Sequence, residues 1–157
     1  MKSILSIIVN DQAGVLTRIA GLFNRRGFNI DSITVGKTED PGLSRMTIIV
    51  QGDKRIVEQV KKQLHKQLDV HKVMDFTDEP MVVRELIMVK VNATPSSLPE
   101  IRNLIEPFRS TVVDVSHSTI TVQTTGNEEK LNAFIELLKP YGIKDLVRTG
   151  FAAIQRG

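Results

Sequence analysis

The fold follows from the stretch Asn10-Asp11-Gln12-Ala13-Gly14-Val15-Leu16, which joins a short apolar run to a segment with helical periodicity. The apolar run predicts a strand over residues 3–9. Beyond the stretch, apolar residues recur at the spacing of one helical face, which predicts an amphipathic helix over residues 15–26. The residues of this face are Val15, Ile19, Leu22 and Phe23, with Leu16 and Ala20 expected to widen it. The stretch is therefore a strand–loop–helix connection.

The loop chemistry suits a free amino acid. Gly14 stands where the chain turns into the helix, and its missing side chain lets another group approach the backbone. The first N–H groups of a helix have no acceptor inside the helix, so they can receive a carboxylate. Asp11 offers a negative oxygen to an ammonium group. An ordinary turn with a surface aspartate fits the same residues, so both readings stay open at this point.

Composition narrows the class of protein. The chain has 157 residues, 41% of them hydrophobic and 25% charged, with a net charge of +3 and no cysteine. Lysine, arginine and acidic residues are interspersed, which is typical of a mixed solvated surface and not of a nucleic-acid footprint. The first apolar run is interrupted by Ser6 and stops at Asn10, too short for a signal-peptide core. No segment approaches the roughly 20 apolar residues that span a bilayer. We expect a cytoplasmic protein without membrane or nucleic-acid partners.

Taken in order, the first half predicts a βαββαβ unit. A turn at Glu39-Asp40-Pro41-Gly42 separates two strands, Gly27 closes the first helix, and Asp53 caps the second. The predicted strands cover residues 3–9, 28–38, 44–51 and 70–76. This order is the ferredoxin-like unit, whose strands lie in the order 4-1-3-2 and leave residues 28–38 on an edge.

The second half repeats the pattern after a polar linker at residues 77–80. It predicts strands over 84–91, 111–115, 119–124 and 143–147, helices over 98–108 and 127–138, and a tail without an assigned element. The predicted fold class is α+β, with two tandem ferredoxin-like domains over residues 1–78 and 79–157. The loop Asn92-Ala93-Thr94-Pro95-Ser96 has neither glycine nor an acidic residue, so the candidate ligand loop is not duplicated.

Enzyme and RNA-binding classes find little support, and no catalytic residue is assigned. The sequence has no glycine-rich dinucleotide or phosphate motif. His65, His71 and His117 lie on different elements at spacings that match no metal site, so we assign them surface or structural roles. An RNA-binding sheet needs aromatic residues on its central strands, and residues 44–51 have none. An enzyme of acylphosphatase type would need a glycine-rich phosphate loop where this chain has Asp11-Gln12-Ala13-Gly14.

The chain resembles the ACT-domain family of small, regulatory subunits of acetohydroxyacid synthase (acetolactate synthase). The resemblance rests on Asp11-x-x-Gly14-Val15-Leu16-x-Arg18-x-x-x-Leu22-Phe23-x-x-Arg26-Gly27-Phe28-Asn29-Ile30, on Ser32-Ile33-Thr34-Val35 and Leu43-Ser44-Arg45-Met46-Thr47-Ile48, and on Arg84-Glu85-Leu86-Ile87-Met88-Val89-Lys90-Val91, Arg148-Thr149-Gly150 and Arg156-Gly157. It spans essentially the whole chain. Asp11 departs from the asparagine of many relatives and adds negative charge beside the expected ammonium.

The resemblance implies a non-catalytic subunit without cofactors of its own. Its partner would be a catalytic subunit that carries thiamine diphosphate, Mg and FAD, and its effector a branched-chain amino acid, usually valine. The alternative is a stand-alone ACT-type amino-acid sensor that acts on another enzyme or on a transcription regulator.

The predicted edge strand implies a homodimer. Edge strands with apolar side chains and few charges tend to pair, and antiparallel pairing about a two-fold axis would join two sheets. This pairing would bring the start of the partner's edge strand to the ligand loop. The expected effector site is therefore shared between subunits and consists of Asp11, Ala13, Gly14, Val15, Leu16, Asn29 and Ile30.

Overall fold

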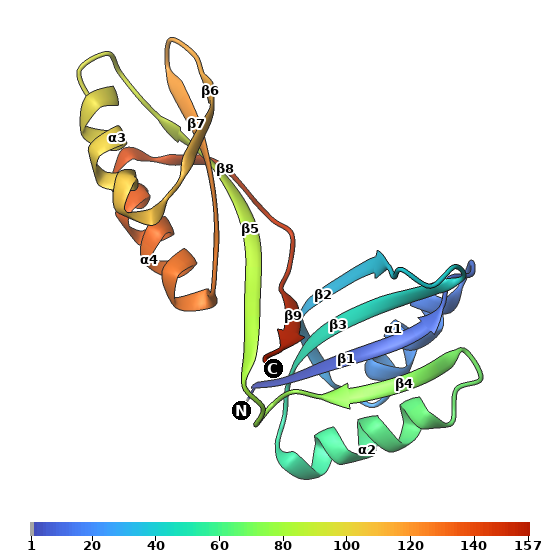
Figure 1. Cartoon of the computed structure of the whole chain (residues 1–157). Coiled ribbons are helices and arrows are strands. Elements are labelled where there is room, and N and C mark those ends of the chain that lie inside the picture. Colours follow the sequence, from blue (N-terminus) through green and yellow to red (C-terminus); the bar gives the residue numbers. More distant parts are fainter. Residues whose placement is uncertain (1) are drawn as a thin grey trace. The chain divides into compact units, whose positions relative to one another are not determined.

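The computed structural model describes residues 2–157, which form two compact units. The first unit runs to Val82 and also contains Phe151–Gly157, and the second is Val83–Gly150. Each unit has an antiparallel sheet with two α-helices against it (Figure 1). The predicted α+β fold class with two ferredoxin-like units is confirmed.

The first unit has the predicted element order: β1 (Lys2–Asn10), α1 (Val15–Arg25), β2 (Asn29–Lys37), β3 (Leu43–Gln51), α2 (Lys54–His65) and β4 (Val70–Asp75). Its strands lie in the order β2-β3-β1-β4, as predicted, so β2 is an edge strand. β3 runs antiparallel to both β1 and β2. β1 and β2 are therefore parallel, and their first residues lie at the same end of the sheet.

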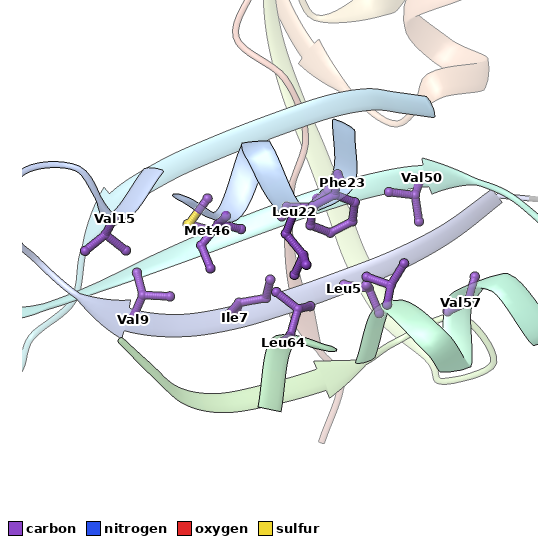
Figure 2. Close-up of a cluster of buried hydrophobic side chains, with 13 residues drawn as sticks. Leu5, Ile7, Val9, Val15, Leu22, Phe23, Met46, Val50, Val57 and Leu64 are labelled. Atoms are coloured by element: carbon purple, nitrogen blue, oxygen red, sulfur yellow. The ribbon is translucent and has the colours of Figure 1, made fainter. Parts of the chain in front are cut away.

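The core of this unit lies between the helices and one face of the sheet. Figure 2 shows side chains of α1, α2, β1 and β3 converging there. Period-two alternation on the strands and the apolar stripes on the helices produce this face. One expected member differs, because Leu16 is 48% exposed and does not widen the buried face of α1. The core residues are Leu5, Ile7, Val9, Val15, Ile19, Leu22, Phe23, Met46, Ile48, Val50, Val57, Val60 and Leu64.

Both helices have the predicted end signals. Gly27 has φ +70°, and the N–H groups of Gly27 and Phe28 donate to Asn24 O and Phe23 O at 3.1 and 3.0 Å. This pair of hydrogen bonds is a Schellman motif, which needs a residue that tolerates positive φ. At the start of α2, Asp53 Oδ1 accepts from Ile56 N at 2.9 Å.

The second unit repeats the arrangement with β5 (Met81–Asn92), α3 (Leu98–Ile105), η1 (Glu106–Phe108), β6 (Thr111–Val115), β7 (Thr119–Gly126), α4 (Glu128–Leu138), η2 (Lys139–Tyr141) and β8 (Ile143–Arg148). Its strand order is β6-β7-β5-β8. Buried side chains of β5 and β7 face those of α3 and α4, among them Val89, Val122, Ile101 and Phe134. Among residues 2–157, no helix is long and apolar enough to cross a membrane.

The C-terminal tail differs from expectation. The predicted division placed it in the second domain without an element, whereas Phe151–Gly157 belongs to the first unit. It contains β9 (Ala152–Gln155), and Arg156 N donates to Pro80 O of the same unit at 2.9 Å. Phe151 N donates to Ser32 Oγ at 3.0 Å, and Thr34 Oγ1 donates to Phe151 O at 3.1 Å. Ser32 and Thr34 pair with Ile49 and Thr47 of β3, whose side chains alternate with the core residues. The tail thus covers part of the sheet face that the helices leave open.

Candidate functional site

The loop between β1 and α1 is exposed and has the backbone that its glycine predicts. Gly14 occupies the N-cap position of α1 with φ 87° and ψ −11°, a left-handed conformation that side chains disfavour. Asp11 N donates to Gly42 O at 2.8 Å, so the turn before β3 holds the start of the loop. The loop is fixed at its base and open at its tip.

The start of α1 presents free donors. Arg18 N donates to Gly14 O at 3.0 Å, which is the first bond of the regular helical pattern. The N–H groups of Leu16 and Thr17 come before this bond and have no intrahelical acceptor. Within the part of the chain that the structure describes, no side chain caps this helix start. Both residues are exposed. The positive end of the helix dipole adds to the attraction of these donors for a carboxylate.

Charged and polar side chains frame the loop, and sequence reasoning did not assign them to the site. Arg18 Nε donates to Asp69 Oδ2 at 2.8 Å, and Asn10 Nδ2 donates to Asp69 Oδ1 at 3.4 Å. The hydrogen bond from Arg18 lowers the pKa of the Asp69 carboxyl below its ordinary value. His71 Nε2 lies 2.5 Å from Asn10 Oδ1. Arg18 belongs to the family pattern quoted above, but nothing in the sequence indicates its pairing with a residue 51 positions away.

The Arg18 guanidinium also lies beside Gly14. A Cβ added to Gly14 would be 3.1 Å from Arg18 Nη1. A side chain at position 14 would therefore meet both an unfavourable φ and a cation. This is the local reason why glycine suits the position.

Asp11 has a nearby cation of its own. Lys37 Nζ lies 3.8 Å from Asp11 Oδ2, and the two side chains are 84% and 39% exposed. An ion pair this exposed contributes little stability, because water screens it and two mobile side chains must be ordered. The Asp11 carboxylate thus stays accessible at the edge of the loop.

The structure separates the expected site residues into two groups. Asn10, next to the loop, pairs with Leu43, whereas Asn29 pairs with Gln51 at the far end of β3. Within one chain, Asn29 and Ile30 are therefore remote from the loop. Of the loop residues, Asp11, Ala13, Gly14 and Leu16 are exposed, and Val15 is a core side chain with 3% exposure. Val15 can meet a ligand only through its backbone.

Comparison with known proteins identifies both halves of the chain. A family described as the AHAS small subunit-like ACT domain matches residues 5–72, and a family described as the small subunit of acetolactate synthase matches residues 84–157. The chain is 53% identical to the acetolactate synthase small subunit of Bacillus subtilis over 158 residues, covering 100% of this chain and 92% of that protein. It is 50% identical to the probable acetolactate synthase small subunit of Archaeoglobus fulgidus over 157 residues, covering 100% and 98%.

A solved structure agrees in fold over the same length. The acetolactate synthase small subunit from Thermotoga maritima superposes with a TM-score of 0.92 at 40% sequence identity, covering 100% of this chain and 98% of that chain. The resemblance deduced from the residue pattern is thereby confirmed.

Proposed function

Because this chain belongs to the family of acetolactate synthase small subunits, we propose that it is a regulatory subunit that activates the catalytic subunit and makes it sensitive to valine. In this proposal the chain is not itself catalytic and acts in the cytoplasm. Thiamine diphosphate, Mg and FAD belong to the catalytic partner. The first domain, expected over residues 1–78, senses the amino acid.

The observation that carries the sensing role is the open start of α1 after Gly14. The N–H groups of Leu16 and Thr17 are positioned to receive the carboxylate of valine, and Asp11 can accept a hydrogen bond from its ammonium group. Leu16 is exposed beside these groups and offers an apolar surface to the valine side chain.

The pocket is completed by a second copy of the chain. β2 is an edge strand parallel to β1, so it begins at the end of the sheet opposite the loop. Antiparallel pairing of two β2 strands about a two-fold axis brings the start of one β2 to the loop end of the other subunit. The partner's Asn29 and the partner's Ile30 would then lie beside Asp11 and Gly14, as the sequence led us to expect.

A pocket shared by two subunits can control their arrangement. Valine shifts the enzyme toward an inhibited state only if it binds that state more tightly than the active one. A coupling of roughly 1–3 kcal/mol is ordinary for such systems, and the catalytic subunit must then change valine affinity by the same factor.

The second domain has a different role. Its loop after β5 closes on itself, because Thr94 N donates to Ser97 Oγ at 2.8 Å and Ser97 N donates to Thr94 O at 3.0 Å. This loop lacks a glycine that would leave the helix start open to a ligand, as Gly14 does before α1. We assign this domain to support of the catalytic subunit or transmission of the effector signal.

The test is reconstitution. The purified chain is mixed with the acetolactate synthase catalytic subunit of the same organism, and acetolactate formation is measured with and without valine. We expect the chain to raise the activity and valine to lower it again. Valine binding without any effect on the catalytic subunit would instead favour a stand-alone sensor for another target.

A further inference from the structure

Positive charge is concentrated on the helices of the first unit. Together with their C-terminal cap residues Arg26 and Lys66, α1 and α2 contain eight lysines and arginines and a single acidic residue, Glu58. The net charge of the whole chain is only +3, so the remainder is on balance acidic. The interspersed charges of the sequence become segregated because both amphipathic helices turn their polar faces outward from the same side of the sheet.

Part of this charge lines a surface hollow of ≈ 500 Å³. Its lining residues are Arg26, Gln59, Lys62, Gln63, His65 and Lys66, which we call the basic hollow. Every one of them is polar, and no carboxylate is present. With Arg26, Lys62 and Lys66 around it, the hollow is complementary to negative charge.

Lys61, the neighbour of Lys62 in the sequence, forms ion pairs within the first unit. Its Nζ lies 2.9 Å from Glu58 Oε1 and 3.3 Å from Asp75 Oδ2. The hydrogen bond to Glu58, with the contribution of Asp75, raises the pKa of Lys61 above its ordinary value despite partial desolvation. Lys61 thus forms ion pairs with two carboxylates of the same unit.

The cations that line the basic hollow differ from Lys61 in their ion pairing. Among the residues that the structure describes, no salt bridge joins Arg26, Lys62 or Lys66 to a carboxylate. Lys62 and Lys66 are exposed and four positions apart at the C-terminal end of α2. They repel each other, although the helix dipole favours positive charge at this end. The charge of Arg26, Lys62 and Lys66 therefore faces solvent, where an acidic group of another molecule can reach it.

We propose that the basic hollow is a docking site for an acidic surface segment of the acetolactate synthase catalytic subunit. This inference rests on the proposed function and adds the contact surface to it. Charge complementarity at such a site accelerates association and fixes the orientation of the partner.

A nucleic acid fits the hollow less well. Phosphate backbones are bound by extended basic surfaces that neutralise several successive charges. Here the cations gather in one hollow on one unit, and in the second unit, Val83–Gly150, eight basic residues are balanced by eight acidic ones. A compact cationic site on a chain whose remaining charges are on balance acidic suits a local acidic segment of a protein.

The experiment reverses charge inside and outside the basic hollow in the full-length chain. One variant carries Lys62→Glu with Lys66→Glu. The matched control carries Lys54→Glu with Lys72→Glu, the same change in net charge at exposed positions of the first unit outside the hollow. A milder pair, Lys62→Gln with Lys66→Gln, removes charge without reversing it. Circular dichroism and calorimetric valine binding establish that each variant is folded and keeps its effector site.

Affinity for the catalytic subunit is then measured at low and physiological salt. We expect the hollow variant to bind at least about tenfold more weakly than the control at low salt, with a smaller salt dependence, and the glutamine pair to fall between them. Equal affinities of the hollow and control variants would overturn the inference. So would binding of duplex DNA by the unmodified chain that the hollow variant loses. Failure of the unmodified chain to bind the catalytic subunit would count against the proposed function itself.

Discussion

Arg18 and Asp69 join the first turn of α1 to the connection between α2 and β4. Nε and Nη2 of Arg18 both reach Asp69 Oδ2, at 2.8 and 2.6 Å, while Asp69 Oδ1 accepts from Asn10. The three residues come from separate parts of the chain and surround the loop that contains Gly14. The Arg18–Asp69–Asn10 contacts therefore fix the loop of the proposed carboxylate site, in addition to the hydrogen bond from Asp11 N to Gly42 O.

This pair predicts a pH-dependent contribution to stability. Arg18 lowers the pKa of Asp69 in the folded chain, so folding favours the ionised carboxylate. The contribution is complete above the unfolded-state pKa of about 3.9 and disappears as pH falls through the lower folded-state value. We expect Asp69→Asn to lower the unfolding midpoint in denaturant at pH 7, and the difference from the unmodified chain to vanish in strong acid. A difference independent of pH would show that the ionised pair is not its cause.

The tail predicts a contrast between Phe151 and Ile154, which are separated by two alanines. Phe151 is 8% exposed and Ile154 is 62% exposed. Truncating a buried phenylalanine removes apolar contact and leaves a cavity, so Phe151→Ala should destabilise the chain by about 3 kcal/mol. Ile154→Ala should stay within about 0.5 kcal/mol of the unmodified chain. Equal effects in denaturant unfolding would mean that the tail does not pack on the first unit.

We predict that the buried carboxylate of Glu85 stabilises the second unit. Its oxygens accept from Arg148 Nε at 2.9 Å and from Gly150 N at 2.8 Å, and its side chain is 3% exposed. Glu85→Ala removes the acceptor of the part-buried Gly150 N–H and empties a buried side-chain position, so it should cost about 2–4 kcal/mol. The control is Glu136→Ala, which removes an exposed pair with Lys139 and should cost at most about 0.5 kcal/mol. The comparison is made by thermal unfolding of the full-length chains.

The edge strand β2 predicts the oligomeric state. Its outer side has no neighbouring strand among residues 2–157, and Val35 on this strand is 50% exposed. We expect a dimer at micromolar concentration in sedimentation equilibrium. Val35→Lys places a charge on the pairing edge and should shift the equilibrium toward monomer. A monomeric unmodified chain would contradict both the dimer and the shared effector pocket.

Most elements of the fold could be predicted because their signals are local. The stripe Val15, Ile19, Leu22 and Phe23 sets the buried face of α1, and Gly27 and Asp53 act on backbone groups at most four residues away. Strand order followed from the βαββαβ sequence of elements. Leu16 was misplaced because it lies at the margin of the apolar stripe, where the first turn of the helix meets solvent.

The parts that could not be predicted depend on distant partners. β9 is four residues long and has too little alternation to indicate a strand. Phe151 is held by Ser32 and Thr34, more than 100 positions earlier in the chain. The Arg18–Asp69 pair could not be predicted either, because in the sequence each residue is an ordinary surface charge. The Arg148-Thr149-Gly150 run was recognised as a family feature, but its role in holding Glu85 needed the structure.

The most direct test of valine sensing compares Gly14→Asp with Gly14→Asn in the reconstituted enzyme. Both side chains face the same positive φ, and aspartate and asparagine tolerate it better than other residues, but only aspartate places a carboxylate where that of valine would bind. Acetolactate formation is measured against valine concentration for both variants and for the unmodified chain. We predict that all three activate the catalytic subunit, that Gly14→Asp escapes inhibition by valine, and that Gly14→Asn keeps more of it. Full inhibition of Gly14→Asp by valine, or its loss of activation together with inhibition, would contradict a separate valine site at the start of α1.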